Sequence, residues 1–353
     1  MTRSIMVMAG GTGGHIYPAL AVADYLRERG WSVIWLGART GMEAKIVPQH
    51  GYEMAWIRFS GLRGKGLVRA ALLPLNLLIA FVQSARAIFA HRPDVVLGMG
   101  GYVAFPGGMM ASLLRRPLAI HEQNSVAGLT NKVLAGVADR ALSGFPNVFK
   151  RGAWTGNPVR PDIASVPQPE ARYAGRAGPL RLLVIGGSLG AQALNEVVPQ
   201  ALAQIPAASR PAVTHQAGAT HVEALKANYA KAGVDVDARA FIEDMAKEYA
   251  ASDLVVCRAG ASTIAELAAA GVPSVLVPFP HAVDDHQTVN ARFLSDRGAA
   301  VLIPQQELTP VRLAELLGTL DRARLLAMAR AARAVGKPDA TAAVAAVCVE
   351  LAA

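Results

Sequence analysis

Short apolar runs rich in Val, Ile and Leu alternate along the chain with longer stretches of helical spacing. This alternation predicts parallel strands joined by crossover helices, and therefore an α/β fold with doubly wound parallel sheets. In the first half, strands are expected at Ile5–Ala9, Trp31–Leu36, Asp94–Leu97 and Leu118–His121. In the second half, they are expected at Leu180–Ile185, Ala238–Phe241, Leu254–Cys257 and Ser274–Val277.

A unit of strand, glycine-rich loop and helix occurs twice. The first loop, Gly10–Gly14, leads into a helix that we expect Pro18 to open and Gly30 to end. The second loop, Gly186–Ala191, leads into a helix expected over Gln192–Ile205. In doubly wound sheets, ligands bind outside the carboxyl ends of the strands, where both loops lie.

The repeated unit predicts two domains, 1–158 and 159–339, joined near Asn157-Pro158. A C-terminal helix at about 340–353 is expected to pack back on the first domain. A length of 353 residues agrees with two domains of roughly 150 residues each.

Composition narrows the class of protein. With 52% hydrophobic and 17% charged residues, the chain can bury a core, which excludes disordered and collagen-like classes. Cys257 and Cys348 belong to no Cys/His cluster, so neither a structural zinc site nor a secreted disulfide framework is expected. A reducing cytosol fits this cysteine usage.

The positive charge is concentrated in the first half. Residues 1–157 carry 17 Lys and Arg against 7 Asp and Glu, a net charge of +10, whereas residues 158–353 carry 18 against 19, a net charge of −1. A basic patch attracts nucleic acid, nucleotides or anionic lipid alike.

Two apolar segments have features of membrane or targeting signals. Ile5–Ala9 stops after five residues, too short for a signal peptide, and predicts a buried strand. In Leu67–Ala90, Pro74 and Asn76 interrupt the apolar run, which falls short of the ~20 residues that span a bilayer.

The basic residues from Arg58 to Arg92 flank the apolar stretch Leu72–Val82, with no acidic residue between them. This pattern suits either a surface that dips into an anionic membrane or a buried helix with solvated ends. Nucleic acid is disfavoured, because no aromatic residues are interleaved with the basic ones as stacking platforms.

The glycine loops lack the known nucleotide-binding fingerprints. A dinucleotide motif on Gly11 and Gly13 would need glycine at Ile16, and neither loop contains the Gly-Lys-Ser/Thr of a P-loop. The backbone N–H groups at the start of a helix would still suit a phosphate or a polar substrate, although a simple tight turn has the same pattern.

Two polar clusters follow predicted strands of the first half. His15 ends the first glycine loop, where it could be a general base or a hydrogen-bonded loop residue. The run His121-Glu122-Gln123-Asn124 favours binding, since core packing has little use for it. It is no HExxH metal motif, because Ser125 stands where the second histidine would be.

Arg258 to Glu266 allow two interpretations. Thr263 and Glu266 have the spacing of a capping box. Alternatively, a helix N-terminus faces a nucleotide there, with Glu266 on ribose hydroxyls and Arg258 near the phosphates.

Two acidic segments of the second half are candidate metal sites. Asp235-Val236-Asp237 has the form of a metal-binding DxD, but an exposed loop is favoured. Asp284-Asp285-His286-Gln287 is either metal-seeking or simply polar, close to the carboxyl end of a strand.

Taken together and in order, these motifs resemble the MurG family of glycosyltransferases, family 28, which adds N-acetylglucosamine to lipid I to make lipid II. The matching segments are Gly10–His15, Gly98–Tyr102, His121–Asn124, Gly156–Arg160, Gly186–Ser188 and Arg258–Glu266. The resemblance implies a GT-B fold, in which two Rossmann-like domains face each other across a cleft.

The resemblance implies that the C-terminal domain binds the UDP-sugar donor and the N-terminal domain binds the lipid acceptor. The donor residues expected by motif position are Thr12, Gly13, Gly14, Asn124, Arg160, Ser188, Ile242, Arg258, Ala261, Ser262, Thr263, Ile264, Ala265, Glu266 and Gln287. Those expected for the acceptor are Gly11, Gly100, Gly101 and Tyr102. Some family members have two adjacent glutamines where this chain has His286-Gln287, so no role is carried over to His286.

The implied reaction is inverting transfer to the C4 hydroxyl of the muramoyl sugar, with His15 as the expected base and Glu122 as the reserve. UDP-N-acetylglucosamine is a substrate, and no cofactor or obligatory metal is expected.

The lipid acceptor implies a peripheral enzyme on the cytoplasmic face of the plasma membrane. The residues expected to contact the anionic surface are Arg63, Lys65, Arg69, Leu73, Leu77 and Arg86. Other cell-wall synthesis or division proteins are implied as partners, though the sequence names none.

Two rival functions remain at this point. A UDP-N-acetylglucosamine 2-epimerase would share the architecture and the donor but need no lipid. A non-catalytic protein that binds nucleotide sugar or lipid would release no UDP in the presence of lipid I.

Overall fold

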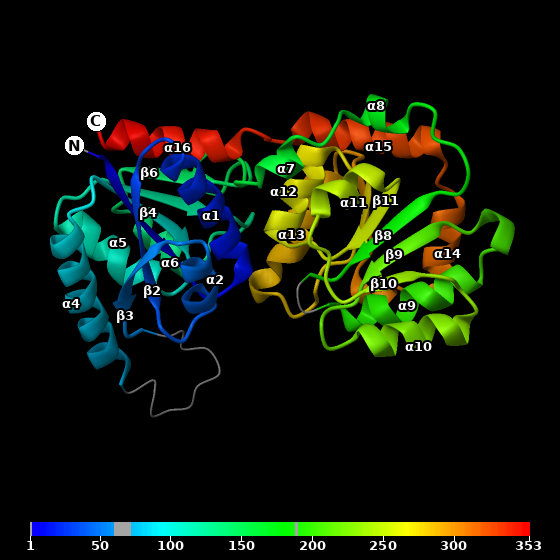
Figure 1. Ribbon diagram of the computed structural model, residues 1–353, viewed down its shortest axis with the longest axis horizontal. Coiled ribbons are helices and arrows are strands. Elements are labelled where there is room, and N and C mark those ends of the chain that lie inside the picture. The colour runs from blue at the N-terminus through cyan, green and yellow to red at the C-terminus, as the bar shows by residue number, and fades with distance from the viewer. Residues whose placement is uncertain (1, 60–71, 188–189) are drawn as a thin grey trace. The chain divides into compact units, whose positions relative to one another are not determined.

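The structure is a computed structural model that describes residues 2–59, 72–187 and 190–353. It divides into two compact units (Figure 1). The N-terminal unit comprises Met1–Arg160 and Asp339–Ala353, and the C-terminal unit comprises Pro161–Pro338. Each unit contains a sheet in which all strand pairs of the described residues are parallel, so the predicted α/β class with doubly wound sheets is confirmed.

The sheet of the N-terminal unit has the order β3-β2-β1-β4-β5-β6-β7 within the described residues. Its strands are β1 (Ser4–Ala9), β2 (Ser32–Ala38), β3 (Glu53–Ile57), β4 (Val95–Gly100), β5 (Leu118–Glu122), β6 (Arg140–Ser143) and β7 (Ala153–Trp154). Its helices are α1 (Gly13–Arg27), α2 (Glu43–Gln49), α4 (Leu73–His91), α5 (Ala104–Leu113), α6 (Leu129–Leu134) and α16 (Ala340–Leu351).

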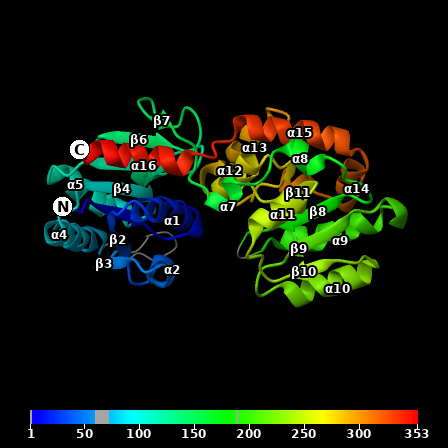
Figure 2. The same cartoon turned by 45° about the horizontal axis from the view of Figure 1, so that its top comes forward.

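Both faces of this sheet are buried, which explains the unbroken apolar runs of the central strands. Along β1, Ile5 and Val7 belong to the core on one face, together with Val344 of α16. Met6 and Met8 belong to the core on the other face. The C-terminal helix α16 lies beside α1, as Figure 2 shows.

The sheet of the C-terminal unit has the order β10-β9-β8-β11-β12-β13 in the part of the chain described. Its strands are β8 (Arg181–Ile185), β9 (Ala212–Gln216), β10 (Asp237–Arg239), β11 (Leu254–Cys257), β12 (Ser274–Leu276) and β13 (Ala300–Leu302). Its α-helices are α7 (Pro161–Ala164), α8 (Pro169–Tyr173), α9 (Gln192–Ala203), α10 (Val222–Ala232), α11 (Met245–Ala251), α12 (Ala261–Ala270), α13 (His286–Ser295), α14 (Pro310–Gly318) and α15 (Arg322–Val335). Short 3-10 helices are η1 (Ala207–Ser209), η2 (Val283–Asp285) and η3 (Gln305–Glu307).

Two sequence expectations are wrong in detail. Helix α1 begins at Gly13, so Pro18 lies inside it rather than opening it, and the end of the glycine loop forms the first helical turn. Because Pro18 has no N–H, the helical hydrogen bond to the Gly14 carbonyl is missing. This loss lies near the N-terminal end of α1, where the first N–H groups of the helix also lack intrahelical partners. The strand expected over Ala238–Phe241 ends at Arg239, and Phe241 is 58% exposed.

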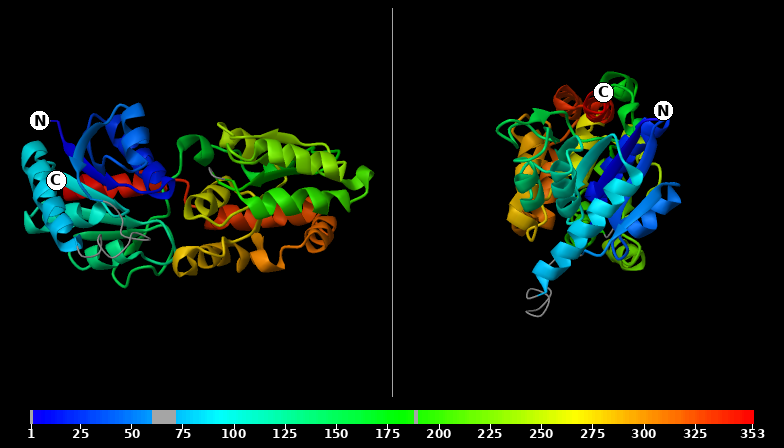
Figure 3. Two further views of the ribbon diagram at one scale, coloured as in Figure 1. Left: turned by 90° about the horizontal axis from the view of Figure 1, so that it is seen from below. Right: turned by 90° about the vertical axis from the view of Figure 1, so that its left-hand side faces the viewer.

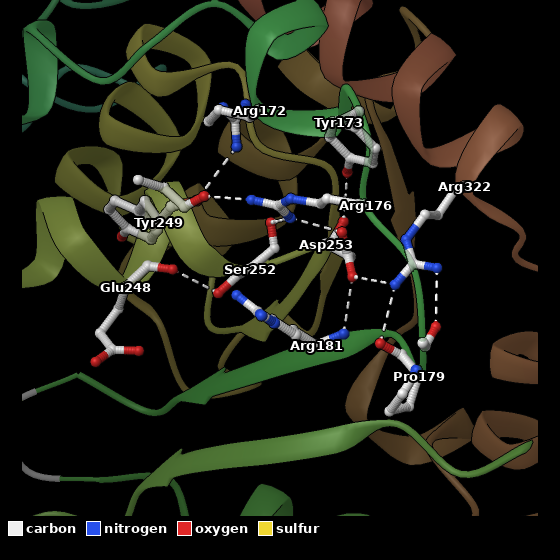
Figure 4. Close-up of polar contacts among 12 residues, drawn as sticks. Arg172, Tyr173, Arg176, Pro179, Arg181, Glu248, Tyr249, Ser252, Asp253 and Arg322 are labelled. Carbon is white, nitrogen blue, oxygen red and sulfur yellow. Dashed lines mark hydrogen bonds and ion pairs between the residues drawn. The ribbon is translucent and has the colours of Figure 1, made fainter. Parts of the chain in front are cut away.

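A buried carboxylate joins the amino ends of two strands in the C-terminal unit (Figure 4). Asp253 is fully buried and pairs with Arg176 at 2.6 Å and with Arg322 at 3.4 Å. It also accepts a hydrogen bond from the Arg181 N–H at 2.9 Å, and its carbonyl accepts one from the Tyr173 hydroxyl. This residue therefore ties β8 and β11 to α8 and α15.

We expect Asp253→Ala to destabilise the C-terminal unit by roughly 3–5 kcal/mol, because two guanidinium groups lose their buried counter-ion. Hydrogen–deuterium exchange should show lost protection in β8 and β11, with β1 unchanged as an internal reference. Asp237→Ala is the matched control, since its ion pair with Arg239 is exposed and should contribute at most ~1 kcal/mol. Equal protection in the two variants would contradict the assignment.

Candidate functional site

The first glycine loop is anchored by a carboxylate that the sequence analysis missed. Glu43 of α2 is fully buried, and its oxygens accept hydrogen bonds from the N–H groups of Gly11 at 3.0 Å and Ala38 at 3.1 Å. The hydroxyl of Tyr102 also donates to Glu43, and burial together with this carboxylate raises the pKa of Tyr102 to about 12. A single Glu in a short helix forms no motif, so the sequence alone could not identify this anchoring role.

The loop after β4 lies directly against the first glycine loop. At Gly101, where φ is +81°, a Cβ would overlap the carbonyl oxygen of Gly10. Only glycine allows this approach. It brings Gly100, Gly101 and Tyr102, expected at the acceptor site, next to Gly11 at the carboxyl edge of β1 and β4.

His15 lies half-buried in the first turn of α1, after Thr12, Gly13 and Gly14. Its Nδ1 is 2.7 Å from Oε1 of Gln123, which follows β5. The structure thus joins His15 to the polar run His121–Asn124, and it adds Gln123 to the expected site residues.

Glu122 is 2% exposed, and both its oxygens are engaged within the protein. One accepts from the N–H of Asn124 at 2.9 Å, and the other accepts from Gly128 N–H at 3.1 Å and Asn131 Nδ2 at 2.9 Å. Glu122 therefore holds the loop that carries Asn124. His15 is half-buried and Glu122 is buried, and the role of either residue as the base stays a prediction.

In the C-terminal unit, a buried amide links two segments expected at the donor. Gln216, at the end of β9, donates from Nε2 to the Gly187 carbonyl at 3.0 Å. Its Oε1 accepts from the N–H of Ile242 at 2.8 Å. Gln216 was missed because strand β9 was not predicted.

Ser188 lies outside the described residues, and Arg160 is half-buried at the end of the N-terminal unit's first segment.

The capping-box interpretation of Thr263 and Glu266 is wrong. Helix α12 starts at Ala261 with Gly260 as its N-cap, so Thr263 is already the third helical residue and no side chain caps the helix. Glu266 instead accepts a hydrogen bond from the Tyr249 hydroxyl at 3.0 Å. The alternative, in which this helix N-terminus faces a nucleotide, stays a prediction.

The loop after β12 is held by two expected donor residues. The Arg258 guanidinium donates to the carbonyls of Val277 and Pro278, each at 3.1 Å, and burial lowers its pKa. Gln287 accepts from the Phe279 N–H at 2.9 Å. The contacts that either residue makes with a ligand stay a prediction.

Across the described ranges, no group of three or more His, Cys, Asp and Glu side chains is placed to hold a metal ion. Asp235 and Asp237 are both exposed, but Asp237 begins strand β10, where it pairs with Arg239, so the exposed-loop expectation does not hold for Asp237.

Helix α4 presents an apolar face to solvent. Only 17% of its most apolar stretch is buried, and by length and composition alone its 19 residues could cross a membrane. Figure 3 shows it along the outside of the N-terminal unit. Its exposed apolar side chains include Leu75, Leu78, Val82 and Phe89.

The expectation that Pro74 interrupts this stretch is wrong, because Pro74 occupies the first turn of α4, where a missing N–H breaks no helical bond. Of the expected membrane residues, Leu73 and Leu77 are half-buried and Arg86 is exposed. Arg63, Lys65 and Arg69 lie outside the described residues.

Known families match both units. The model of the glycosyltransferase family 28 N-terminal domain matches residues 5–143, and that of the family 28 C-terminal domain matches residues 181–344. The chain belongs to glycosyltransferase family 28. The family resemblance drawn from the motifs is therefore confirmed.

Named members of the family match along the whole chain. A UDP-N-acetylglucosamine–N-acetylmuramyl-(pentapeptide) pyrophosphoryl-undecaprenol N-acetylglucosamine transferase from Dechloromonas aromatica (strain RCB) is 63% identical, covering 100% of both chains. A protein of the same name from Aromatoleum aromaticum (strain DSM 19018 / LMG 30748 / EbN1) is 65% identical, covering 99% of this chain and 98% of its own.

Solved structures agree. The crystal structure of MurG from Acinetobacter baumannii is 44% identical, with 99% of each chain covered and a TM-score of 0.87. The glycotransferase of kitacinnamycin, at 20% identity and a TM-score of 0.71 over 99% of each chain, shares the fold. The GT-B class of fold is confirmed.

We expect Glu43→Gln to loosen the glycine loop of this family 28 chain. An amide cannot accept at both positions, so one backbone N–H would face an NH2 group, at a cost of about 1–3 kcal/mol. Hydrogen exchange at residues 10–14 and the urea midpoint from tryptophan fluorescence measure the effect, since all four Trp residues lie in the N-terminal unit. The exposed Glu28→Gln is the control, and equal exchange in both variants would refute the anchoring role.

Proposed function

We propose that the chain is an inverting glycosyltransferase that moves N-acetylglucosamine from UDP-N-acetylglucosamine to the C4 hydroxyl of the muramoyl sugar of lipid I, forming lipid II. The observation that carries this proposal is 63% identity over the full length to a transferase whose name states the sugar and the pyrophosphoryl-undecaprenol acceptor. The polar groups at the carboxyl edges of both sheets support it.

The C-terminal unit binds the donor in this proposal. The N-terminus of α12, from Ala261 to Thr263, supplies N–H groups and a positive dipole end for the pyrophosphate, whereas the Ile264 N–H donates to the Gly260 carbonyl within the helix. Glu266 accepts from the ribose hydroxyls while Tyr249 holds its carboxylate in place. The segment at Ile242, fixed by Gln216, receives the uracil.

The remaining donor contacts are proposed from motif position. By their places in the motifs, Arg160, Ser188, Arg258 and Thr263 are assigned to the nucleotide, Asn124 and Gln287 to the sugar hydroxyls, and Thr12–Gly14 to the donor as well.

The N-terminal unit binds the acceptor and supplies the base. Gly11 and the loop Gly100–Tyr102 receive the muramoyl sugar. His15 takes the C4 proton as the hydroxyl oxygen attacks the anomeric carbon from the face opposite UDP, and the bond between this carbon and the UDP oxygen breaks. UDP leaves with the electron pair, and its charge is met by helix N-termini and cationic side chains. No cofactor or metal step enters this scheme.

Because the acceptor's polyprenyl chain stays in the bilayer, the enzyme works peripherally at the cytoplasmic membrane face. The exposed apolar face of α4 provides the contact, together with the basic residues that flank this segment in the sequence between Arg58 and Arg92. Partners among cell-wall synthesis or division proteins are also proposed, without a site on this chain.

The transfer reaction predicts that UDP release depends on lipid I. We expect His15→Ala to lower kcat by roughly 10²–10⁴-fold with donor binding retained, as loss of a general base does. Glu266→Ala should instead weaken donor binding by about tenfold or more, through a lost charged hydrogen bond. A coupled assay for UDP, with isothermal titration of donor, separates these effects.

His221→Ala, an exposed histidine of the C-terminal unit, serves as the control. UDP or epimer formed from donor alone would favour the epimerase, and donor binding without UDP release would favour a binding protein. Full activity of His15→Ala would remove the base assignment.

The membrane contact predicts that Leu75→Glu combined with Leu78→Glu weakens binding to vesicles of phosphatidylglycerol and phosphatidylethanolamine by at least about fivefold, because apolar area is lost and negative charge is added. Cosedimentation measures the binding. Val311→Glu, at a position 54% exposed on α14, is the matched control. Unchanged binding of the double variant would show that α4 does not contact the membrane.

A further inference from the structure

A chain of hydrogen bonds runs from a backbone carbonyl to His15, and its direction follows from which atoms can donate. It starts at His121 of β5, which is fully buried, with Nε2 2.9 Å from the carbonyl oxygen of Gly156. A carbonyl only accepts, so Nε2 of His121 carries a proton. Burial lowers the pKa of His121 to about 4, so the ring is neutral near pH 7 and its Nδ1 has a lone pair.

The next member is the side-chain amide of Gln123. Its Nε2 lies 3.2 Å from the backbone carbonyl of His121 and 3.1 Å from the His121 Nδ1. Both of these atoms are acceptors, so the amide nitrogen must face His121. The backbone of Gln123 is held as well, because its carbonyl accepts from Asn157 Nδ2 at 2.9 Å. The amide therefore has one orientation, with Oε1 turned toward His15.

The chain ends on the imidazole of His15. Oε1 of Gln123 has no hydrogen and lies 2.7 Å from His15 Nδ1, so Nδ1 must be the donor. In a neutral imidazole the proton on Nδ1 leaves the lone pair on Nε2.

The fold keeps space for this last hydrogen bond. At Gly100, where φ is +98°, a Cβ would lie 2.8 Å from Nδ1 of His15 and 3.5 Å from Oε1 of Gln123. Three segments that are distant in the sequence, namely the first turn of α1, the end of β4 and the residues after β5, thus meet at one hydrogen bond.

We infer that Gln123 is a positioning residue which, oriented by His121, holds His15 in the tautomer whose Nε2 accepts the proton of the acceptor hydroxyl. The tautomer follows from the hydrogen bonds alone, whereas its catalytic use rests on the proposed function. In that use, the C4 hydroxyl proton moves to Nε2, and the imidazolium keeps its Nδ1 hydrogen bond to Gln123.

The tautomer is tested on the full-length wild-type protein without ligand, by nitrogen-15 NMR of histidine side chains, at a pH above which the His15 signals no longer change. We expect His15 to show a proton on Nδ1 and a lone pair on Nε2. His215, buried beside the Tyr229 hydroxyl in the other unit, is an internal reference. A proton on Nε2 of His15 would overturn the inference, whatever the kinetics.

Two variants test the role of Gln123. Gln123→Met removes the acceptor, so we expect the Nε2-protonated form of His15 to become populated and kcat to fall by about tenfold or more, with the KM for UDP-N-acetylglucosamine unchanged. Gln123→Glu keeps an acceptor for His15, so it should retain the Nδ1-protonated form and more activity than Gln123→Met. His221→Gln is the control for assignment and activity.

The outcomes separate this inference from the proposed function. If Gln123→Met leaves the His15 tautomer as in the wild type, Gln123 does not position it and the inference fails. If the tautomers are as expected but His15→Ala remains active, the tautomer assignment stands and the proposed base role fails.

Discussion

Three buried polar side chains hold loops at the carboxyl edges of the two sheets by satisfying the backbone groups of these loops. Glu43 holds the N–H of Gly11, Glu122 holds those of Asn124 and Gly128, and Gln216 joins Gly187 to Ile242. A buried acceptor left without its donor costs as much as a lost hydrogen bond, so these contacts confine the loops to one arrangement.

This anchoring explains how a parallel sheet can support transfer chemistry without a catalytic motif in one segment. The strands supply a rigid edge, and the buried side chains bring loops from different strands to fixed positions on it. In the proposed reaction, binding groups on such an edge need little reorganisation when charge develops on the departing pyrophosphate. The buried contacts that hold the loops rigid therefore also keep the binding groups in place for the proposed reaction.

The sequence predicted the features that repeat or are local. The alternation of apolar runs and helical stretches gave the class of fold, and the two glycine loops gave the duplicated unit. The family motifs added most of the candidate site. The end of β5 was predicted as polar, but the roles within it became visible only in the structure, where Glu122 is a loop anchor and Gln123 contacts His15.

The rest depends on contacts between distant segments, which spacing cannot show. Thr263 and Glu266 have the spacing of a capping box, yet α12 begins two residues before Thr263 and Glu266 contacts Tyr249 of α11. Glu43 and Gln216 carry no pattern, because their importance comes from the backbone groups that they meet. The exposed apolar face of α4 could not be predicted either, because the sequence does not show which side of this helix packs against the core.

The central claim is that the C-terminal unit binds the sugar nucleotide and the N-terminal unit binds the lipid-borne alcohol. The most direct test is hydrogen–deuterium exchange with UDP alone and, separately, with a soluble lipid I analogue. We expect UDP to protect residues 240–244 and 258–266 and to leave 98–104 unchanged, and the analogue to protect 10–14 and 98–104. Protection by UDP confined to the N-terminal unit, or by the analogue confined to the C-terminal unit, would contradict the account.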